Sequence, residues 1–127
     1  MRQLEEEGYV IEAVRNKGYR LLEAADVMTE AELGSRMKTR WLGRNLVYFP
    51  ETDSTNIQAR RLAAEGCPEG TLVVADRQNA GKGRRGRSWA SPSGTSIYMS
   101  FVLKPDIPPY CASMVTLAAG MAVVKAV

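Results

Sequence analysis

A short segment that combines glycines with cations is the feature that most limits how this chain can fold. Residues 80–87 read Ala-Gly-Lys-Gly-Arg-Arg-Gly-Arg, so eight consecutive positions hold four cations and three glycines. Cations packed this closely repel one another, so a folded chain retains them where an anion binds. Glycine has no Cβ and tolerates positive φ, which lets backbone N–H groups close around a small anion. The segment therefore predicts a clamp for a phosphate or an adenylate.

The flanking sequence excludes two phosphate-binding loops that the segment matches in letters. Gly81-x-Gly83-x-x-Gly86 fits the dinucleotide fingerprint, and residues 81–88 nearly fit a Walker loop, with Arg87 in place of its lysine. Both loops need a helix directly after them, because the helix N-terminus holds the phosphate. Here a strand is predicted at 71–75, and the turn residues 91–94 follow the segment. We therefore expect fixed cations to supply the field that a helix dipole would give.

Two other interpretations of the basic segment stay open on its residues alone. Arg-Gly segments that bind nucleic acid are long and repetitive, whereas this one is short and bracketed by predicted strands. A charge run is also commonly a solvated hairpin without a ligand. Trp89 favours a site, because a large ring beside cations can cover a ligand or stack on a base, although it can equally be a core residue.

A polar triplet at the start of a predicted helix is the second site candidate. Ser54, Thr55 and Asn56 open a helix that the pattern extends to residue 66. One such residue caps a helix for about 1 kcal/mol, and Thr55 with Gln58 matches a capping box. Three are more than one cap needs, so the surplus hydroxyl and amide can bind a polar ligand head. Gln78, just before the basic segment, adds a donor and an acceptor at the same mouth.

Composition limits the chemistry further. The length of 127 residues fits one domain, or one domain with part of another, and the net charge of +3 is smaller than the charge of residues 82–87 alone. No histidine is present, which excludes Ser-His-Asp and Cys-His catalysis and histidine-ligated zinc. Cys67 and Cys111 show neither metal nor disulfide spacing, and no signal peptide is seen, so we expect a cytoplasmic protein. The apolar stretch 114–127 is too short to span a bilayer.

Residue patterning predicts the order of elements along the chain. We expect a helix end at 4–8, a hairpin of strands 9–14 and 19–22 around a turn at 16–18, a connector at 23–28, a helix at 29–38 opened by a capping box, and a strand at 46–49 ended by Pro50. Strands at 71–75 and 95–103 follow, the second with Ile97, Met99 and Phe101 on one face, and a buried helix begins at Ser113. The start and the uncapped finish at 123–127 both suggest a fragment.

The first hairpin follows a helix end, as the wing does in a winged-helix domain. Arg15, Lys17 and Arg20 lie on or beside it, where contacts to DNA phosphates occur. A small edge hairpin with solvated charges explains the same residues equally well.

Taken together, these residues resemble the biotin protein ligases. The resemblance rests on Ser54-Thr55-Asn56, on the run from Gln78 to Trp89, and on the strand Ser96–Ser100, and it covers essentially the whole chain. The hairpin at 8–22 resembles the wing of bifunctional members that also repress biotin genes. The implied fold class is α+β: a class II synthetase-like catalytic domain, with a mixed sheet and flanking helices, incomplete and preceded by a winged-helix wing remnant. Residues 1–25 would be the wing part, 26–44 a linker with a short helix, and 45–127 the N-terminal half of the catalytic domain.

The resemblance implies a two-step reaction. Biotin and ATP, with Mg²⁺, give biotinyl-5′-AMP and pyrophosphate, and the biotinyl group then passes to a lysine of a biotin carboxyl carrier protein domain. No enzyme-linked intermediate is needed, which suits a chain without histidine. Operator DNA and a homodimer are implied for the full-length protein, and no membrane partner is expected.

The roles that the resemblance assigns fall into three groups, and none is a metal ligand. The residues expected to bind biotin are Ser54, Thr55, Asn56, Gln78, Lys82, Gly83 and Arg84, of which Lys82 and Arg84 are also expected to be catalytic. Those expected to bind the adenylate and phosphate are Gly81, Arg85, Gly86, Arg87 and Trp89. Those expected to contact DNA are Arg15, Lys17 and Arg20.

Two departures from the family pattern affect these expectations. Lys82 stands where the family usually has arginine, which keeps the charge but loses the planar fork. The family's Lys-Trp-Pro-Asn-Asp segment, the rest of the central sheet, the small C-terminal barrel and the first winged-helix helices do not occur in the sequence, so we expect little or no ligase activity from these 127 residues alone. The alternative from another class is a DNA-binding transcriptional regulator whose basic loop contacts phosphate. A lipoate-type ligase ranks lower, because it should lack the arginine-dense motif.

Overall fold

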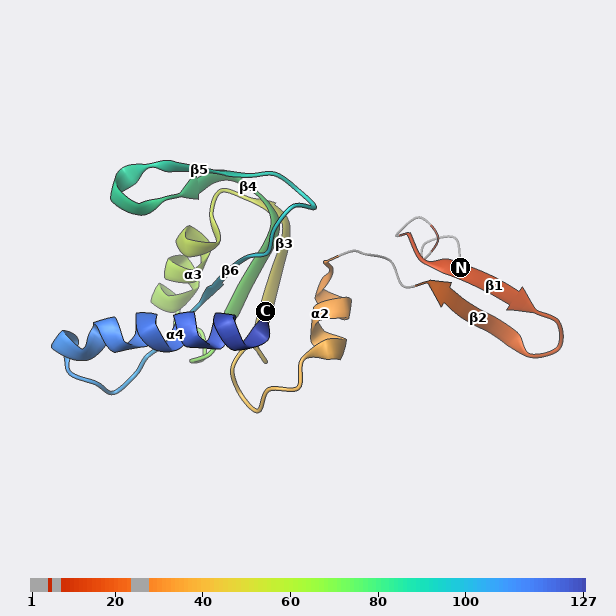
Figure 1. The fold of residues 1–127 in the computed structure, drawn as a ribbon, viewed down its shortest axis with the longest axis horizontal. Coiled ribbons are helices and arrows are strands. Elements are labelled where there is room, and N and C mark those ends of the chain that lie inside the picture. The colour runs from red at the N-terminus through yellow and green to blue at the C-terminus, as the bar shows by residue number, and fades with distance from the viewer. Residues whose placement is uncertain (1–4, 6–7, 24–27) are drawn as a thin grey trace.

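The structure has a mixed α+β architecture. The computed structural model describes Glu5, residues 8–23 and residues 28–127, which form a two-stranded sheet, a four-stranded sheet and several helices (Figure 1). Most of the predicted helix end at 4–8 and of the connector at 23–28 lies outside the described residues. Gly8 has a φ of 89° and its N–H donates to the Glu5 carbonyl at 3.0 Å, as a helix-ending glycine does.

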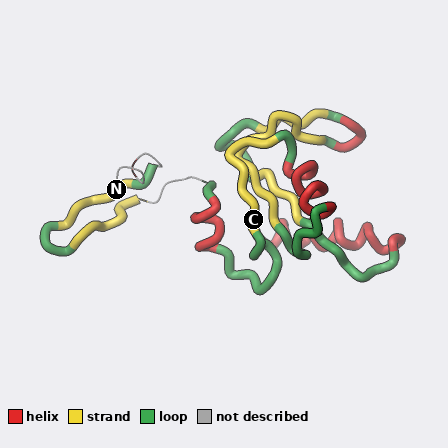
Figure 2. The backbone as a smooth tube through the Cα atoms, turned by 180° about the vertical axis from the view of Figure 1, so that it is seen from behind, coloured by secondary structure: helices red, strands yellow, loops and turns green. Residues whose placement is uncertain are grey.

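The two-stranded sheet is the predicted hairpin. Strands β1 (Val10–Val14) and β2 (Gly18–Glu23) pair antiparallel. The turn contains Asn16 at φ 60° and Gly18 at φ 91°, so the predicted need for left-handed residues is confirmed. Figures 1 and 2 show this hairpin to one side of the larger sheet, and its apolar Tyr19 is 65% exposed.

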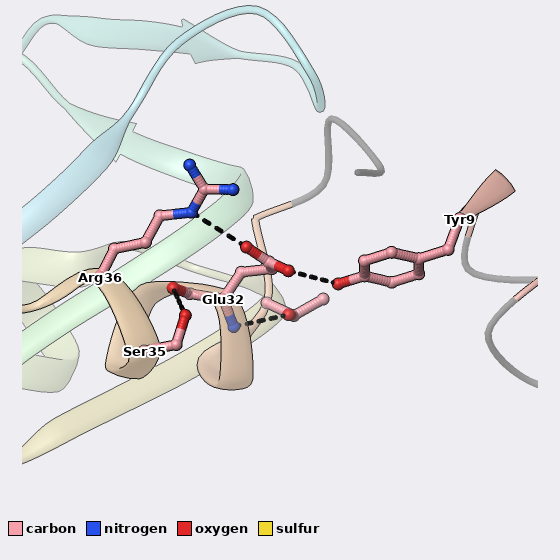
Figure 3. A network of polar contacts seen from close by, with 5 residues as sticks. Tyr9, Glu32, Ser35 and Arg36 are labelled. Atoms are coloured by element: carbon pink, nitrogen blue, oxygen red, sulfur yellow. Dashed lines mark hydrogen bonds and ion pairs between the residues drawn. The ribbon is translucent and has the colours of Figure 1, made fainter. Parts of the chain in front are cut away.

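The short helix α2 (Glu30–Arg36) begins as the capping pattern predicts. The Thr29 hydroxyl accepts a hydrogen bond from the Glu32 N–H at 3.3 Å. The Glu32 side chain, however, accepts from the Tyr9 hydroxyl at 2.7 Å and the Arg36 guanidinium at 3.0 Å, instead of closing the box (Figure 3). The Tyr9 bond, followed by Arg36, holds the pKa of Glu32 below its usual range. This carboxylate therefore links the residue just before the hairpin to α2, which ends before residue 38.

The four-stranded sheet is built around one long central strand, β4. On one side β4 pairs parallel with β3, and on the other it pairs antiparallel with β6 along its first residues and with β5 along its last. Helix α3 makes the crossover between the parallel strands. The bounds are β3 Leu46–Thr52, α3 Thr55–Ala64, β4 Leu72–Lys82, β5 Ser88–Ser91 and β6 Tyr98–Phe101.

Two strand boundaries differ from those predicted. Pro50 does not end β3, which continues to Thr52. Because β3 lies at the edge of the sheet and the pairing register steps from Phe49 to Glu51, the missing N–H of proline costs no ladder bond. Strand β4 runs through the glycine-rich residues to Lys82, seven residues beyond the predicted end, whereas β6 is shorter than the predicted 95–103.

The core lies between α3 and one face of the sheet, where Ala59, Val73 and Val102 are buried together. Apolar contact of this kind is what holds a short helix against a sheet. Helix α3 ends as predicted at Gly66, at φ 86°, where the Cys67 N–H reaches back to the Leu62 carbonyl at 3.0 Å. This packing fixes the N-terminal end of α3 beside the centre of β4.

The apolar residues near the end of the chain are more exposed than predicted. The alternation around β6 is confirmed, but its buried residues are Tyr98 and Ser100, while Ile97 is 70% exposed. Helix α4 (Ala112–Ala126) forms where a helix was expected, yet none of its residues is buried, so its expected burial is wrong in this structure. Together with the preceding turn η2 (Pro109–Cys111) it spans 18 helical residues, long and apolar enough to cross a membrane, which overturns the length argument from 114–127. Core helices meet the same criteria, so no membrane role follows.

Candidate functional site

The basic segment forms the tip of the hairpin that joins β4 to β5. Its first residues belong to the end of β4, and the Gly83 N–H donates to the Arg87 carbonyl at 2.7 Å to close the turn. The tip, η1 (Arg84–Gly86), places Arg85 at φ 60° and Gly86 at φ 75°. The segment is thus a strand, a tight turn and a strand, which confirms that no helix follows it.

A register shift in β4 shapes the base of this hairpin. Gln78 pairs with Ser91, but Gly81 pairs with Trp89, so β4 carries an extra residue there. A Cβ on Gly81 would lie 2.5 Å from the Trp89 carbonyl oxygen and 2.8 Å from Ser91 Oγ. Gly81 is therefore needed for close approach of two backbones, and not for positive φ. The Ala80 N–H donates to the Asp53 carbonyl at 2.8 Å, which ties the bulge to the start of α3.

Gln78 connects α3 to β5 through a polar network. Its Oε1 accepts from the Thr55 N–H at 2.8 Å and from the Thr55 hydroxyl at 3.2 Å. Its Nε2 donates to Ser91 Oγ at 2.9 Å, and Ser91 Oγ in turn lies 3.3 Å from the Trp89 carbonyl. Thr55 and Ser91 are each only 4% exposed. The predicted proximity of Thr55 and Gln78 is thus present as direct contact.

The other two residues of the triplet have different surroundings. Ser100 Oγ, on β6, lies 2.9 Å from both Thr55 Oγ1 and Asn56 Oδ1, and its single proton can point to either. Ser54 is the N-cap residue of α3, but its side chain makes no capping hydrogen bond although the residue is 1% exposed. Ser54 lines the pocket described below, which makes its hydroxyl a candidate to bind a ligand there.

Asp53, the residue before the N-cap of α3, holds Ser54 and Gln58 in place. Its Oδ1 accepts from the Ser54 N–H at 2.5 Å and from the Gln58 side-chain amide at 3.0 Å. These bonds, the backbone one above all, hold the pKa of the Asp53 carboxyl below its usual range. The predicted capping box of Thr55 and Gln58 is therefore wrong, since Gln58 serves Asp53.

An open pocket of about 380 Å³ gathers most of the predicted site residues. The triplet and Gln78 line one part, and Lys82, Gly83, Arg84 and Trp89 line another. The sequence did not indicate the contribution of β6, whose Tyr98 lines the pocket together with Ile97 and Met99. Only the alternation of that strand could have indicated it, and alternation does not say which face meets the site.

Not every predicted residue reaches this pocket. Gly81, Arg85 and Arg87 are absent from its lining, and Gly86 lines a neighbouring pocket instead. In the part of the chain that the structure describes, neither the four cations of the segment nor Arg15 and Lys17 of the first hairpin form an ion pair. Arg20, in contrast, is 2.6 Å from Glu12, so it is not a free cation. The described residues contain no group of three His, Cys, Asp or Glu that could hold a metal ion.

Comparison with known proteins gives concordant matches. Residues 48–127 match the Biotin/lipoate A/B protein ligase family. The chain is 45% identical over 125 residues to the Bifunctional ligase/repressor BirA of Bacillus subtilis (strain 168), which covers 98% of this chain and 38% of that protein. It is 36% identical over 86 residues to the Biotin--[acetyl-CoA-carboxylase] ligase of Mycobacterium tuberculosis, covering 66% of this chain and 32% of the relative.

Among solved structures, the biotin protein ligase from Aquifex aeolicus in complex with biotin and ATP is 45% identical, with a TM-score of 0.41, covering 49% of this chain and 25% of that one. The chain thus spans well under half the length of these relatives.

Proposed function

Because the chain belongs to the biotin/lipoate A/B protein ligase family, we propose that it carries a substrate-binding part of an ATP-dependent biotin–protein ligase. In the proposed reaction the biotin carboxylate attacks the α-phosphorus of Mg²⁺-bound ATP, and pyrophosphate leaves. The biotinyl group then passes from AMP to a lysine of a biotin carboxyl carrier protein domain. The whole reaction belongs to the longer proteins that this chain matches over part of their length.

One observation carries this proposal: the pocket joins a neutral hydrogen-bonding end to a cationic end. At the neutral end, the Ser54 hydroxyl makes no capping bond, and Gln78 Nε2 uses one of its two protons on Ser91. A ureido group offers a carbonyl acceptor and N–H donors, which these groups can satisfy. Thr55 is hydrogen-bonded to Gln78 and Ser100, so it helps to position these two side chains. It also lines the pocket.

At the cationic end, Lys82 and Arg84 line the pocket without an ion-pair partner among the described residues. A carboxylate attacking a phosphate gathers negative charge, and cations already in place lower that barrier without reorganising. We assign the biotin carboxylate and the α-phosphate to these two side chains. Trp89, 64% exposed at the pocket rim, is placed to cover the adenylate and keep it from water.

The β1–β2 hairpin supports the second part of the proposal, a repressor role for residues 1–25 as the wing of a winged-helix domain. Arg15 and Lys17 are exposed cations at its tip. Arg20 would contribute only if DNA phosphate replaced Glu12 as its partner. Residues 26–44 then act as the linker and 45–127 as the ligase part, in a cytoplasmic protein whose full-length form dimerises.

The test is binding of biotinol-5′-adenylate, a stable analogue of the proposed intermediate, measured by isothermal titration calorimetry on the 127-residue chain. Ser54→Ala and Arg84→Ala should each weaken binding by about tenfold, because each removes a hydrogen bond or a charge-assisted contact. Arg77→Ala is the matched control, since Arg77 is an exposed cation on β4 that pairs with Glu51 at 3.7 Å outside this pocket.

Equal losses in the control and the site variants, or no binding by folded wild-type protein, would contradict the proposal. Salt-sensitive DNA binding that depends on Lys82 and Arg84 would instead support the regulator alternative.

A further inference from the structure

The end of α2 and the loop that joins it to β3 hold a second cluster of cations. Its four members are Arg36, Lys38, Arg40 and Arg44. No acidic residue occurs between Glu32 and Glu51, so the sequence of this segment does not balance their charge. The cluster alone carries more positive charge than the net +3 of the whole chain. Residues 37–45, called the α2–β3 loop below, therefore form a strongly charged part of the surface.

The three cations of the α2–β3 loop are exposed and have no ionic partner. Lys38, Arg40 and Arg44 are all exposed, and none of them forms an ion pair with a described residue. Trp41 lies among them in the sequence and is 55% exposed. Arginine and tryptophan are enriched where proteins contact partners, because they combine hydrogen-bond donors with a large contact area. The loop therefore has the composition of an interaction surface.

Contacts with the turn before β4 hold the α2–β3 loop in one shape. The Gly43 N–H donates to the Gly70 carbonyl at 2.7 Å. The Trp41 ring lies against Gly70, where an added Cβ would come within 2.6 Å of the ring. The Arg44 guanidinium donates through Nε to the Thr39 carbonyl at 2.6 Å, which closes the loop on itself. Backbone held in this way does not have to be ordered when a partner binds.

The α2–β3 loop lies at the opposite end of β4 from the proposed biotin pocket. The Leu72 N–H, at the start of β4, donates to the Asn45 carbonyl at 2.9 Å. Gln78 and Lys82, which line the pocket, belong to the far end of the same strand. A strand rises about 3.3 Å per residue, so roughly 20 Å separates the loop from the nearer of the two. A carrier protein must bring its lysine to the pocket, so this loop is poorly placed to dock it.

Helix α2 joins the α2–β3 loop to the β1–β2 hairpin. Figures 1 and 2 show α2 between that hairpin and the four-stranded sheet, and the loop begins where α2 ends. The Glu32 carboxylate on α2 accepts from the hydroxyl of Tyr9, the residue before β1 (Figure 3). Helix α2 has only seven residues and spans about 10 Å. The loop cations and the hairpin cations Arg15 and Lys17 are therefore linked through a short, hydrogen-bonded element.

We infer that the α2–β3 loop contacts the phosphate backbone of double-stranded DNA, as a second contact surface besides the hairpin. This inference rests on the proposed repressor role of residues 1–25. Exposed cations spread along a segment suit an extended polyanion, and duplex DNA carries one negative charge per roughly 1.7 Å of its axis. Lys38, Arg40 and the Trp41 indole N–H supply donors for phosphate oxygens. Such contacts fix the position of the protein on the duplex and carry no sequence information.

The test measures binding of a short fluorescein-labelled DNA duplex to the 127-residue chain by fluorescence anisotropy over a range of salt concentrations. Lys38→Ala and Arg40→Ala should each weaken binding about fivefold to tenfold near 0.1 M salt, and each should lower the slope of log affinity against log salt by about one. Lys125→Ala is the matched control, because Lys125 is an exposed cation on α4 that forms no ion pair with a described residue. Circular dichroism confirms that the variants are folded.

A second readout locates the contact on the protein. Trp89→Phe leaves Trp41 as the single tryptophan of the chain. Adding the duplex should then change the emission of Trp41, and added salt should reverse the change as the duplex dissociates. Bound duplex with unchanged Trp41 emission would place the contact elsewhere and overturn the inference.

The other results separate this inference from the proposed function. If Lys38→Ala and Arg40→Ala bind the duplex as Lys125→Ala does, the inference is wrong, and a loss in Arg15→Ala would leave the repressor role standing. If the loop variants lose affinity but Arg15→Ala does not, the loop contact is supported and the role of the hairpin as a wing fails. If the loop variants weaken binding of a purified carrier domain and leave duplex binding unchanged, the loop serves a protein partner and the inference is wrong. No duplex binding by folded wild type overturns both the inference and the repressor role, while adenylate binding still tests the ligase proposal.

Discussion

Replacing Gln78 by alanine should loosen the whole site, because this amide holds three elements together. It accepts two hydrogen bonds from Thr55 on α3 and donates one to Ser91 on β5, with donor–acceptor distances of 2.8, 3.2 and 2.9 Å. Each such bond contributes about 1 kcal/mol net. Thr55 and Ser91 are 4% exposed, so water reaches their freed groups poorly.

We therefore expect Gln78→Ala to lower the free energy of unfolding by about 2–3 kcal/mol, because three hydrogen bonds are lost. Water that enters from the open pocket replaces part of this hydrogen bonding. For a chain of this size that corresponds to a fall of about 8–12 °C in Tm. Urea unfolding followed by circular dichroism gives the first value, and a thermal scan gives the second.

Two further variants separate stability from ligand binding. Asn79→Ala removes an exposed neighbour whose side chain, among the described residues, bonds only to Glu51, at 2.6 Å, and should cost less than about 0.5 kcal/mol. Gln78→Glu keeps an acceptor for Thr55 and can accept from the Ser91 hydroxyl, so it should stay close to wild type in stability. It should still lose affinity for biotinol-5′-adenylate, because its carboxylate has no donor for a ureido carbonyl. The reasoning fails if Gln78→Ala and Asn79→Ala unfold at the same urea concentration.

Three other substitutions test single features of the fold. Gly81→Ala should lower the Tm and disturb Trp89 fluorescence, because its Cβ would meet the Trp89 carbonyl at 2.5 Å; an unchanged Tm would contradict this. The pKa of Asp53 is lowered in the folded state, so its stabilisation is present above its unfolded pKa of about 4 and is lost as the pH falls through the folded value. The deficit in urea midpoint of Asp53→Asn relative to wild type should therefore be larger at pH 7 than at pH 3. Thr29→Ala removes the cap of α2 and should cost about 1 kcal/mol, with Ser35→Ala as an exposed control on the same helix.

Local chemistry made some elements predictable from the sequence. The first hairpin follows from an asparagine and a glycine that accept positive φ between two strand-like runs, of which the first is rich in Val and Ile and the second contains Tyr and Leu. The start of α2 follows from Thr29, and the end of α3 follows from Gly66. In each case one or two residues decide the backbone conformation, so no tertiary information is needed.

Features that depend on distant contacts were not predictable. The extension of β4 to Lys82 requires β5 as a partner, and a segment of glycines and cations has no intrinsic strand preference. The sequence spacing of Thr55 and Gln58 matched a capping box, but in the structure the Gln58 side-chain amide donates to Asp53 instead. The roles of Ser91 and Ser100 follow only from sheet register, which brings them against Gln78 and Thr55.

The glycine pattern shows how one sequence motif can arise from different physical needs. In a dinucleotide fold, such glycines serve a strand–loop–helix turn whose helix N-terminus attracts the phosphate. Here Gly81 admits the Trp89 carbonyl, Gly86 takes φ 75° at a hairpin tip, and a Cβ on Gly83 would crowd Arg87 at 3.1 Å. Without a helix N-terminus after it, this hairpin can attract an anion only through exposed side-chain charges. Such charges are screened over about 8 Å at physiological ionic strength. The part of the affinity for biotinol-5′-adenylate that depends on Arg84 should therefore fall with added salt, whereas the part that depends on the Ser54 hydroxyl should change little.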